Sequence, residues 1–167
     1  MIHITHEKPE DFRSIYDINL KSFESDAEAE LVDKLRGVVD PFVSLLAKED
    51  GIILGHILFT PVKVGDSNVR AMGLGPMAVI PHRQGQGIGS ALINDGLMIC
   101  RSMGVKAVFV LGEPEYYTRF GFELASNKGF YYKSEKFEPY FFVLELSPES
   151  LNGISGEALY HKFFDDV

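Results

Sequence analysis

The chain has 167 residues, 46% of them hydrophobic, and its 24 acidic against 16 basic side chains give a formal net charge of −8. This length and apolar content predict one domain, residues 1–167, while an acidic chain without a basic run argues against nucleic acid or an anionic membrane as partner and mildly favours a cationic small substrate. The single Cys100 allows no internal disulfide, and the absence of a signal sequence or an apolar run of about 18 residues predicts a cytoplasmic protein.

The N-terminal part predicts a short strand and two helices. Residues 1–5 alternate apolar and polar side chains, as a short strand does. Apolar side chains then recur at helical spacing over residues 9–22 and predict a first helix. Ser25 is a candidate N-cap with Glu28 three residues on, so a capping box is expected to open a second helix that continues to about Arg36.

The next segments predict antiparallel strands. A strand over residues 42–47 leads to an Asp-Gly turn, and the chain returns as a long strand over residues 52–64. A third strand, over residues 69–79, contains two glycines and a proline near its middle. Such residues inside a strand mark a bulge or the close approach of another backbone or a ligand.

A glycine-rich turn joins this third strand to a helix over residues 87–103. Glycines at positions 85, 87 and 89 leave backbone N–H groups unshielded at the positive end of the helix, where a phosphate or pyrophosphate can bind. The same glycines equally fit a tight strand-to-helix turn with no ligand, since glycine-rich matches have a known false-positive risk.

Three phosphate-binding patterns compete for this turn. A P-loop is excluded, because it closes on Lys followed by Ser or Thr, whereas Gly89 is followed directly by Ser90. A dinucleotide fingerprint that starts at Gly85 needs glycine where Ser90 stands, and its acidic ribose ligand has only a distant counterpart in Glu113, so this interpretation is weakened. The third pattern, Gln/Arg-x-x-Gly-x-Gly/Ala, fits every position of residues 84–89.

A second motif lies beyond the helix. Residues 107–112 predict an apolar strand, and a short helix that starts at Glu113 carries the sequence Tyr-Tyr-Thr-Arg-Phe-Gly-Phe at residues 116–122. Residues 140–146 predict a final strand. The apolar tail beyond it fits either a helix or an extended segment.

The two motifs together resemble the GCN5-related N-acetyltransferase (GNAT) superfamily. In that family the loop that binds the pyrophosphate of coenzyme A (CoA) has the pattern of residues 84–89, and an element Tyr-x-Lys/Arg-x-Gly-Phe resembles residues 117–122. The sequence around this second motif resembles that of a bacterial-type branch of predicted N-acetyltransferases whose acceptors are unassigned.

The resemblance implies a mixed α/β GNAT fold, with a mostly antiparallel sheet, a splayed pair of parallel strands and flanking helices. It implies acetyl-CoA as cosubstrate, without a metal. Arg83 is expected beside the phosphates by its charge and Gln84 by its amide, although a solvated loop position suits Arg83 equally. The implied cofactor-binding residues are Met77, Ala78, Val79, Arg83, Gln84, Gly85, Gln86, Gly87, Ile88, Gly89 and Ser90.

The resemblance also implies direct acetyl transfer to a primary amine of a small molecule or peptide, with no covalent enzyme intermediate. Tyr117 would protonate the departing thiolate as a general acid, and the alternative is that its ring only forms a wall of the cofactor slot. Residues 72–75, in the third predicted strand, contain no carboxylate that could act as the general base. Glu113 is therefore the first candidate for the general base and Glu24 the second, with a water chain as the alternative.

In the family, the first two helices and the loop between them roof the acceptor site, so Glu24 is also a candidate to bind a cationic amine. The acids around it equally favour the positive helix N-terminus and a solvated position. His56 and His82 are interpreted as structural residues and not as the base. The acceptor itself is not readable, and the assembly is expected to be a monomer or a homodimer.

Two other functions stay open at this point. A CoA-binding module could sense or regulate without turnover, and a nicotinamide-dependent oxidoreductase would explain the weaker dinucleotide pattern. Stabilisation by CoA or by a nicotinamide cofactor distinguishes these functions, because a ligand stabilises only the folded state that binds it.

Overall fold

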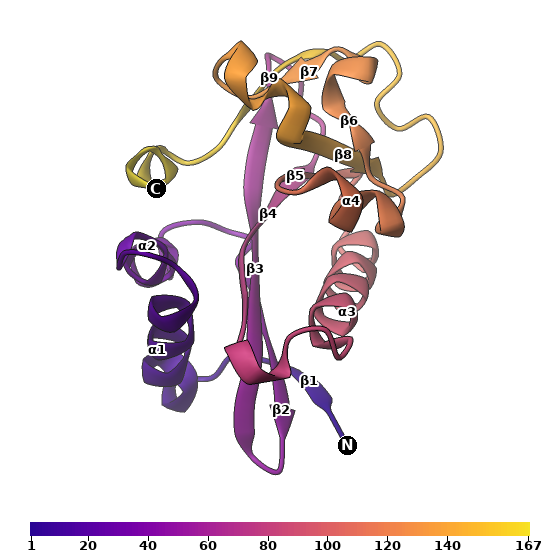
Figure 1. The fold of residues 1–167 in the computed structure, drawn as a ribbon. Coiled ribbons are helices and arrows are strands. Elements are labelled where there is room, and N and C mark those ends of the chain that lie inside the picture. The colour runs from indigo at the N-terminus through magenta and orange to yellow at the C-terminus, as the bar shows by residue number, and fades with distance from the viewer. The chain divides into compact units, whose positions relative to one another are not determined.

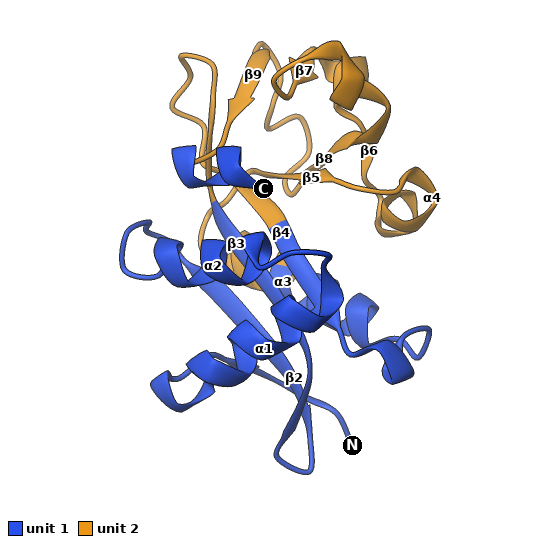
Figure 2. Ribbon diagram, turned by 60° about the vertical axis from the view of Figure 1, so that its left-hand side comes forward, with its two compact units in different colours: residues 1–60, 75–96, 162–167 blue, residues 61–74, 97–161 orange.

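The computed structural model describes residues 1–167, which form two compact units (Figure 2). Unit 1 consists of Met1–Thr60, Gly75–Gly96 and Lys162–Val167, and unit 2 of Pro61–Leu74 and Leu97–His161. Two strands and one helix pass from one unit into the other, so each unit is assembled from segments that are separated in the sequence. The expectation of a single domain stays a prediction.

The regular structure consists of helices α1–α4 and strands β1–β9 (Figure 1). The helices are α1 (Phe12–Ser22), α2 (Ala27–Leu35), α3 (Ile88–Ser102) and α4 (Pro114–Tyr117). The strands are β1 (His3–His6), β2 (Val43–Glu49), β3 (Ile52–Val64), β4 (Ala71–Val79), β5 (Ala107–Leu111), β6 (Glu123–Leu124), β7 (Phe130–Tyr131), β8 (Phe141–Glu145) and β9 (Gly156–Leu159). Short 3₁₀ helices lie between or after them, among them η1 (Pro9–Asp11), η2 (Pro81–Arg83) and η6 (Lys162–Asp166).

The strands follow the order β1-β2-β3-β4-β5-β8-β6, and β9 pairs with both β3 and β7. Along this path β4 and β5 are parallel, from Ala71 opposite Ala107 to Leu74 opposite Val110. The pairs β1–β2, β2–β3, β5–β8 and β6–β8 are antiparallel. The predicted mixed α/β sheet, mostly antiparallel with a parallel pair and flanking helices, is confirmed.

In unit 1, the alternation of side chains along β3 decides what each face of the strand contacts. Gly55 points to α3, where the side chains of Ile88 and Leu92 lie against it. His56, the next residue, points the other way and bonds to Asn19 of α1. Successive residues of a strand face opposite sides, so one strand supports α1 on one face and the first half of α3 on the other.

Close packing of α3 on β3 depends on a second glycine. Gly96 lies against the ring of Phe59, and a Cβ at this position would overlap the ring. The side chains of Phe59, Leu92 and Ile93 are fully buried at this contact. Burying each such side chain stabilises the fold by about 1.5–3 kcal/mol, which more than offsets the weak helix propensity of glycine.

Unit 2 has an aromatic core. The ring of Phe109 in β5 stacks on Phe141 of β8 with centroids 5.4 Å apart, and meets Phe130 edge to face at 5.5 Å. Tyr160, in the tail, packs its ring directly on the backbone of Gly73 in β4. The sequence left open whether the tail is helical or extended, and the structure contains both: an extended strand at β9 and a 3₁₀ helix at η6.

One local prediction is wrong. Asp26, not Ser25, occupies the N-cap position of α2, and it makes no capping hydrogen bond with its side chain. The Ser25 hydroxyl instead accepts a hydrogen bond from the N–H of Ala27, only two residues on, at 3.2 Å. This short-range turn competes with the predicted capping box, because a Ser side chain can bond to several nearby backbone groups.

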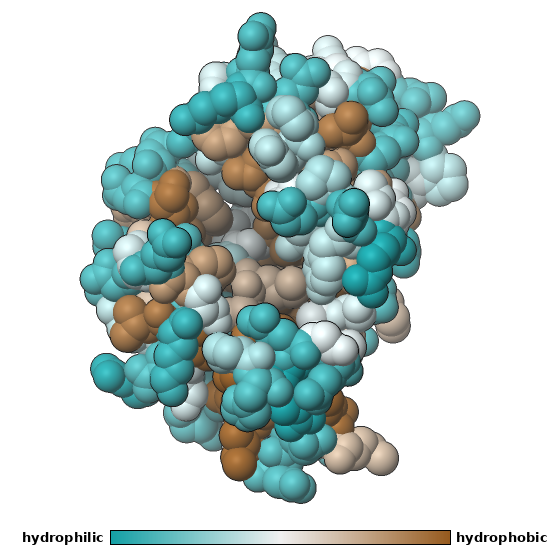
Figure 3. Space-filling model, in the orientation of Figure 1, coloured by the Kyte–Doolittle hydropathy of each residue, from teal (hydrophilic) through white to brown (hydrophobic).

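Hydrophilic side chains cover most of the face shown in Figure 3, and apolar ones form small separate groups on it. Large apolar residues that stay exposed, such as Ile52 and Met98, are typical of a protein surface when they occur singly. None of the helices has the length and apolar character needed to cross a membrane.

Candidate functional site

The predicted phosphate-binding turn lies in unit 1, between the end of β4 and the start of α3. Gly85 and Gly87 have φ angles of +76° and +86°, a region that residues with a Cβ rarely adopt. A Cβ built on either glycine would meet no atom within 4 Å. These glycines are therefore required by the backbone conformation, and the space beside them is open.

The first turn of α3 begins directly after Gly87. The N–H groups of the first helical residues have no carbonyl one turn earlier to bond, and the helix dipole makes this end positive. Ile88 is almost completely buried, whereas Gly89 and Ser90 are half-buried, so the next two residues of this helix turn have more access to solvent. The turn thus has the features of an anion site made by backbone amides.

Hydrogen bonds of four side chains brace the turn within unit 1. The Gln84 amide donates to the carbonyl of Val79 at 3.1 Å. The Arg83 guanidinium donates through Nε to Gln86 Oε1 at 2.7 Å, and through Nη1 to Glu49 Oε1 at 3.1 Å. The hydrogen bond from Arg83 lowers the pKa of Glu49, so this carboxyl group is ionised at neutral pH. The roles of Arg83 and Gln84 toward a phosphate stay predictions.

Tyr117 and Glu113 lie in unit 2, directly after β5. The carbonyl of Glu113 accepts hydrogen bonds from the backbone N–H groups of Tyr116 and Tyr117, both at 3.2 Å, while its carboxylate is exposed. The Tyr117 ring rests on the backbone of Gly112 and meets Tyr116 and Phe122 edge to face, at 5.0 and 5.9 Å. Burial, with a smaller effect of Tyr116, raises the pKa of the Tyr117 phenol above its ordinary value.

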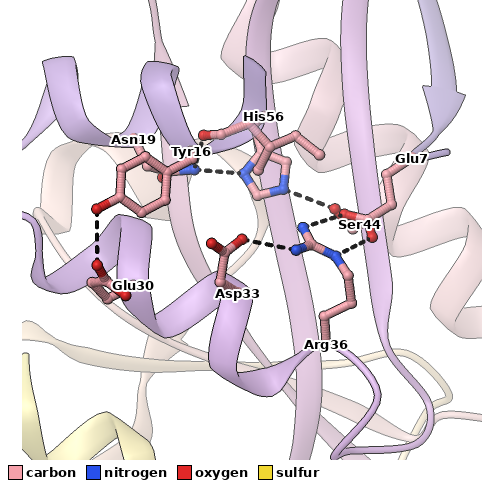
Figure 4. A network of polar contacts seen from close by, with 9 residues as sticks. Glu7, Tyr16, Asn19, Glu30, Asp33, Arg36, Ser44 and His56 are labelled. Atoms are coloured by element: carbon pink, nitrogen blue, oxygen red, sulfur yellow. Dashed lines mark hydrogen bonds and ion pairs between the residues drawn. The ribbon is translucent and has the colours of Figure 1, made fainter. Parts of the chain in front are cut away.

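Glu24 lies in unit 1, exposed in the bend between α1 and α2. Away from this bend, between the first turns of α1 and the last turns of α2, a pocket of about 440 Å³ is lined by Phe12, Arg13, Tyr16, Glu30, Asp33 and Arg36. The Tyr16 hydroxyl donates to Glu30 at 2.9 Å (Figure 4). Arg36 donates to Glu7 through two nitrogens, at 2.7 and 3.1 Å, and to Asp33 at 2.8 Å.

Sequence reasoning missed this Arg36 network. The Asp33–Arg36 pair has the i, i+3 spacing that brings two side chains of a helix together, so this contact of the network could have been predicted from the sequence. The contact with Glu7 joins residues that are far apart in the sequence and has no local signal.

A Ser-His-Asn arrangement lies beneath α1 (Figure 4). The Asn19 amide donates to His56 Nδ1 at 3.1 Å, so the ring proton belongs on Nε2, which donates to the Ser44 hydroxyl at 2.8 Å. All three residues are at most 2% exposed, and burial lowers the pKa of His56 to about 3. A neutral, enclosed histidine cannot exchange protons with a substrate, so this group holds α1 to the sheet.

Other reactive groups are enclosed or dispersed. Cys100 is fully buried in α3, and burial raises the pKa of its thiol to about 12. His82 is exposed within the glycine-rich turn. The His, Cys, Asp and Glu side chains form no group of three or more that could hold a metal ion.

Known proteins resemble this chain over most of its length. A family model described as the acetyltransferase (GNAT) domain matches residues 3–125. The uncharacterized N-acetyltransferase YhbS of Escherichia coli K12 is 38% identical over 160 residues, which cover 95% of this chain and 96% of that protein. The uncharacterized N-acetyltransferase YjhQ of the same strain is 41% identical over 133 residues, 77% of this chain and 72% of its own.

Two crystal structures share both sequence and fold with the chain. The E. coli GNAT family N-acetyltransferase YhbS in complex with CoA is 37% identical, with a TM-score of 0.93 over 98% of this chain and 92% of its own. A GNAT family acetyltransferase from Brucella melitensis in complex with acetyl-CoA is 36% identical, with a TM-score of 0.81 over 99% of both chains. The mixed sheet described above is therefore the fold of these acetyltransferases.

Proposed function

Since the chain belongs to the GNAT family of acetyltransferases, we propose that it transfers the acetyl group of acetyl-CoA directly to a primary amine of a small molecule or peptide. The glycine-rich turn carries this proposal: Gly85 and Gly87 combine a left-handed backbone with open space at the N-terminus of a helix. Relatives of similar fold bind CoA and acetyl-CoA, which favours the CoA pattern of this turn over the dinucleotide fingerprint.

The backbone from Gly85 to Ser90 is proposed to bind the pyrophosphate. Its geometry supports the assignment, because side chains at Gly85 and Gly87 would fill the space where an anion can approach the amides. Gln84 holds the Val79 carbonyl, and so fixes the end of the strand whose backbone, Met77–Val79, is proposed to pair with the rest of the cosubstrate. No metal takes part in this proposal.

Enclosed nucleophiles support direct transfer. The Cys100 thiol is buried, with a pKa raised to about 12, and Ser44 is buried with a neutral histidine beside it. Neither can reach a thioester. In the proposed step the amine nitrogen forms a bond to the acetyl carbon, the carbon–sulfur bond breaks, and the nitrogen loses one proton while the departing thiolate gains one.

We assign the proton donor as Tyr117 and the base as Glu113. The Tyr117 phenol is protonated at neutral pH even at its ordinary pKa, which is the form from which an acid must start, and burial raises the pKa further and so makes it a weaker acid. The exposed carboxylate of Glu113 is open to an amine or to a connecting water. Glu24 is the second candidate for the base and our proposed contact for a cationic acceptor.

The proposed setting is a cytoplasmic monomer or homodimer. An acidic chain with Glu24 exposed in the α1–α2 bend suits a positively charged amine, since opposite charges raise the rate of encounter. The same charge does not suit nucleic acid or an anionic membrane.

Thermal stability measured with CoA, acetyl-CoA and NADPH tests the ligand. At 100 times its Kd, a ligand that binds only the folded state should stabilise it by about 2.7 kcal/mol. We expect CoA and acetyl-CoA to raise the midpoint and NADPH to leave it unchanged, and the reverse result would disprove the proposal.

Turnover requires a second experiment. A panel of small-molecule and peptide amines is incubated with acetyl-CoA, and released CoA is detected by its free thiol. Amine-dependent release identifies an acetyltransferase and its acceptor class. Stabilisation by CoA without release for any amine would instead identify a regulatory module that binds CoA without turnover.

A further inference from the structure

We propose that Glu49 is a positioning residue for the CoA-binding turn: by holding Arg83, it keeps the turn in the conformation that receives the pyrophosphate. Glu49 is the last residue of β2 and lies far from the turn in the sequence. The inference rests on the proposed function, because it assigns a support to the site that would bind the cosubstrate.

The contacts form a short chain from a hairpin to the turn. Glu49 Oε1 accepts from Arg83 Nη1 at 3.1 Å, and Arg83 Nε donates to Gln86 Oε1 at 2.7 Å. Gln86 stands between Gly85 and Gly87, the two residues with left-handed backbones. Arg83 therefore joins the part of the turn with the greatest conformational freedom to a fixed strand.

A bulge at the start of the hairpin supplies a second support. The register of β2 and β3 passes from Ala47 opposite Gly55 to Lys48 opposite Ile53, so Leu54 is an extra residue in β3. The carbonyl of Leu54 accepts a hydrogen bond from the N–H of Ile80 at 3.0 Å, where the turn begins. The hairpin thus holds the turn at Ile80 through backbone and at Arg83 through Glu49.

In this arrangement Glu49 supports the position of Arg83 and does not compete with a phosphate for its guanidinium. A guanidinium has five N–H donors, and the bonds to Glu49 and Gln86 use only two of them, so donors remain for a phosphate. Glycines lose much conformational freedom when they are ordered, and a turn ordered before binding avoids that loss during binding. The N-terminal amine lies 3.7 Å from the other oxygen of Glu49, but it is almost fully exposed and contributes little.

Glu49→Gln tests the inference, with Asp50→Asn as the matched control. Both replace a carboxylate by an amide in the same hairpin, but only Glu49 contacts the turn. In isothermal titration of CoA we expect Glu49→Gln to weaken binding about fivefold to tenfold, and Asp50→Asn to leave the Kd unchanged. The kcat at saturating acetyl-CoA should stay within twofold of the wild type, while the KM for acetyl-CoA rises with the Kd.

Two further measurements test the Glu49–Arg83 contact, and the first, which needs no ligand, separates this inference from the proposed function. Without any ligand, trypsin should cleave after Arg83 faster in Glu49→Gln than in the wild type, because the side chain it recognises is released. In an Arg83→Gln background, Glu49→Gln should no longer change the CoA Kd, as expected for two residues that act through one contact.

Each outcome decides the matter. Tighter CoA binding in Glu49→Gln would show that Glu49 competes with the phosphate, and an unchanged Kd, whether or not cleavage becomes faster, would show that its contact with Arg83 does not support CoA binding; both overturn the inference while the proposed function stands. A wild type that binds no CoA would instead overturn the proposed function, and the inference with it.

Discussion

Two parts of unit 1 use the same residue types for opposite purposes. At the turn after β4, Gly85 and Gly87 have open space beside them, and polar side chains are exposed. Beneath α1 and α3, Gly96 is covered by a phenylalanine ring, and a histidine with a serine and an asparagine is fully enclosed. Residue type suggests chemistry in both places, but only access to solvent distinguishes a binding site from a packing contact.

The sharpest test of the open region is Gly87→Glu. A carboxylate there would occupy the space proposed for the pyrophosphate, so we expect the CoA Kd to rise at least 100-fold in isothermal titration while circular dichroism stays unchanged. The control is Gly37→Glu, whose φ of +82° and open surroundings impose similar strain and the same charge away from the turn. Normal CoA affinity in Gly87→Glu would remove the turn from the binding site.

Tyr117 resembles the enclosed region in that its ring is largely covered by Gly112, Tyr116 and Phe122, although we propose a chemical role for its hydroxyl. If its hydroxyl is the proton donor, Tyr117→Phe should lower kcat roughly 100-fold with little change in acetyl-CoA affinity, whereas Tyr116→Phe should do little. Steady-state kinetics with an accepted amine measures this. A kcat near that of the wild type would assign the ring to packing, and the proton to water.

A substitution in the enclosed region should have the smallest effect, and it should change the stability of the protein without changing CoA binding. Alanine usually stabilises a helix relative to glycine, but at Gly96 its methyl group would overlap Phe59, so we expect Gly96→Ala to destabilise by about 1–3 kcal/mol. Thermal unfolding should show a midpoint lowered by about 3–8 °C. CoA affinity below the transition should not change.

Exposed Asn94 provides the control for this helix, since Asn94→Ala adds a good helix former without a new contact. Adding Phe59→Leu to Gly96→Ala should cost less than the two single changes together, because the smaller side chain makes room for the methyl group. A stabilised Gly96→Ala protein would mean that the ring moves freely and that the contact is loose.

Local patterns predicted most of the fold. Strand alternation, helical spacing and the Asp-Gly hairpin placed β2, β3, α1, α3, β5 and β8 within a few residues of their observed bounds. The parallel pairing of β4 and β5 came from the resemblance to a family, because register between distant strands has no local signal. The pairing of β9 with β3 and β7 was not predicted for the same reason.

The candidate site was predictable only where the backbone makes it. The pattern at residues 84–89 specifies Gly87 and Gly89, and of these Gly87 has a left-handed backbone, as does Gly85 at a position that the pattern leaves open. The contacts of the side chains depend on partners elsewhere in the sequence, as Glu49 for Arg83 and Glu7 for Arg36 show. A single sequence contains no signal for such pairs.

The interleaving of the two units has a consequence for how the protein folds. Segments 1–60, 75–96 and 162–167 complete unit 1, and η6 packs against α2 although they lie at opposite ends of the sequence. Contacts of this range close long loops and slow the search for the native state. Neither unit exists as one continuous stretch of chain, so neither can finish folding early in synthesis, and a cut between residues 61 and 74 would divide both.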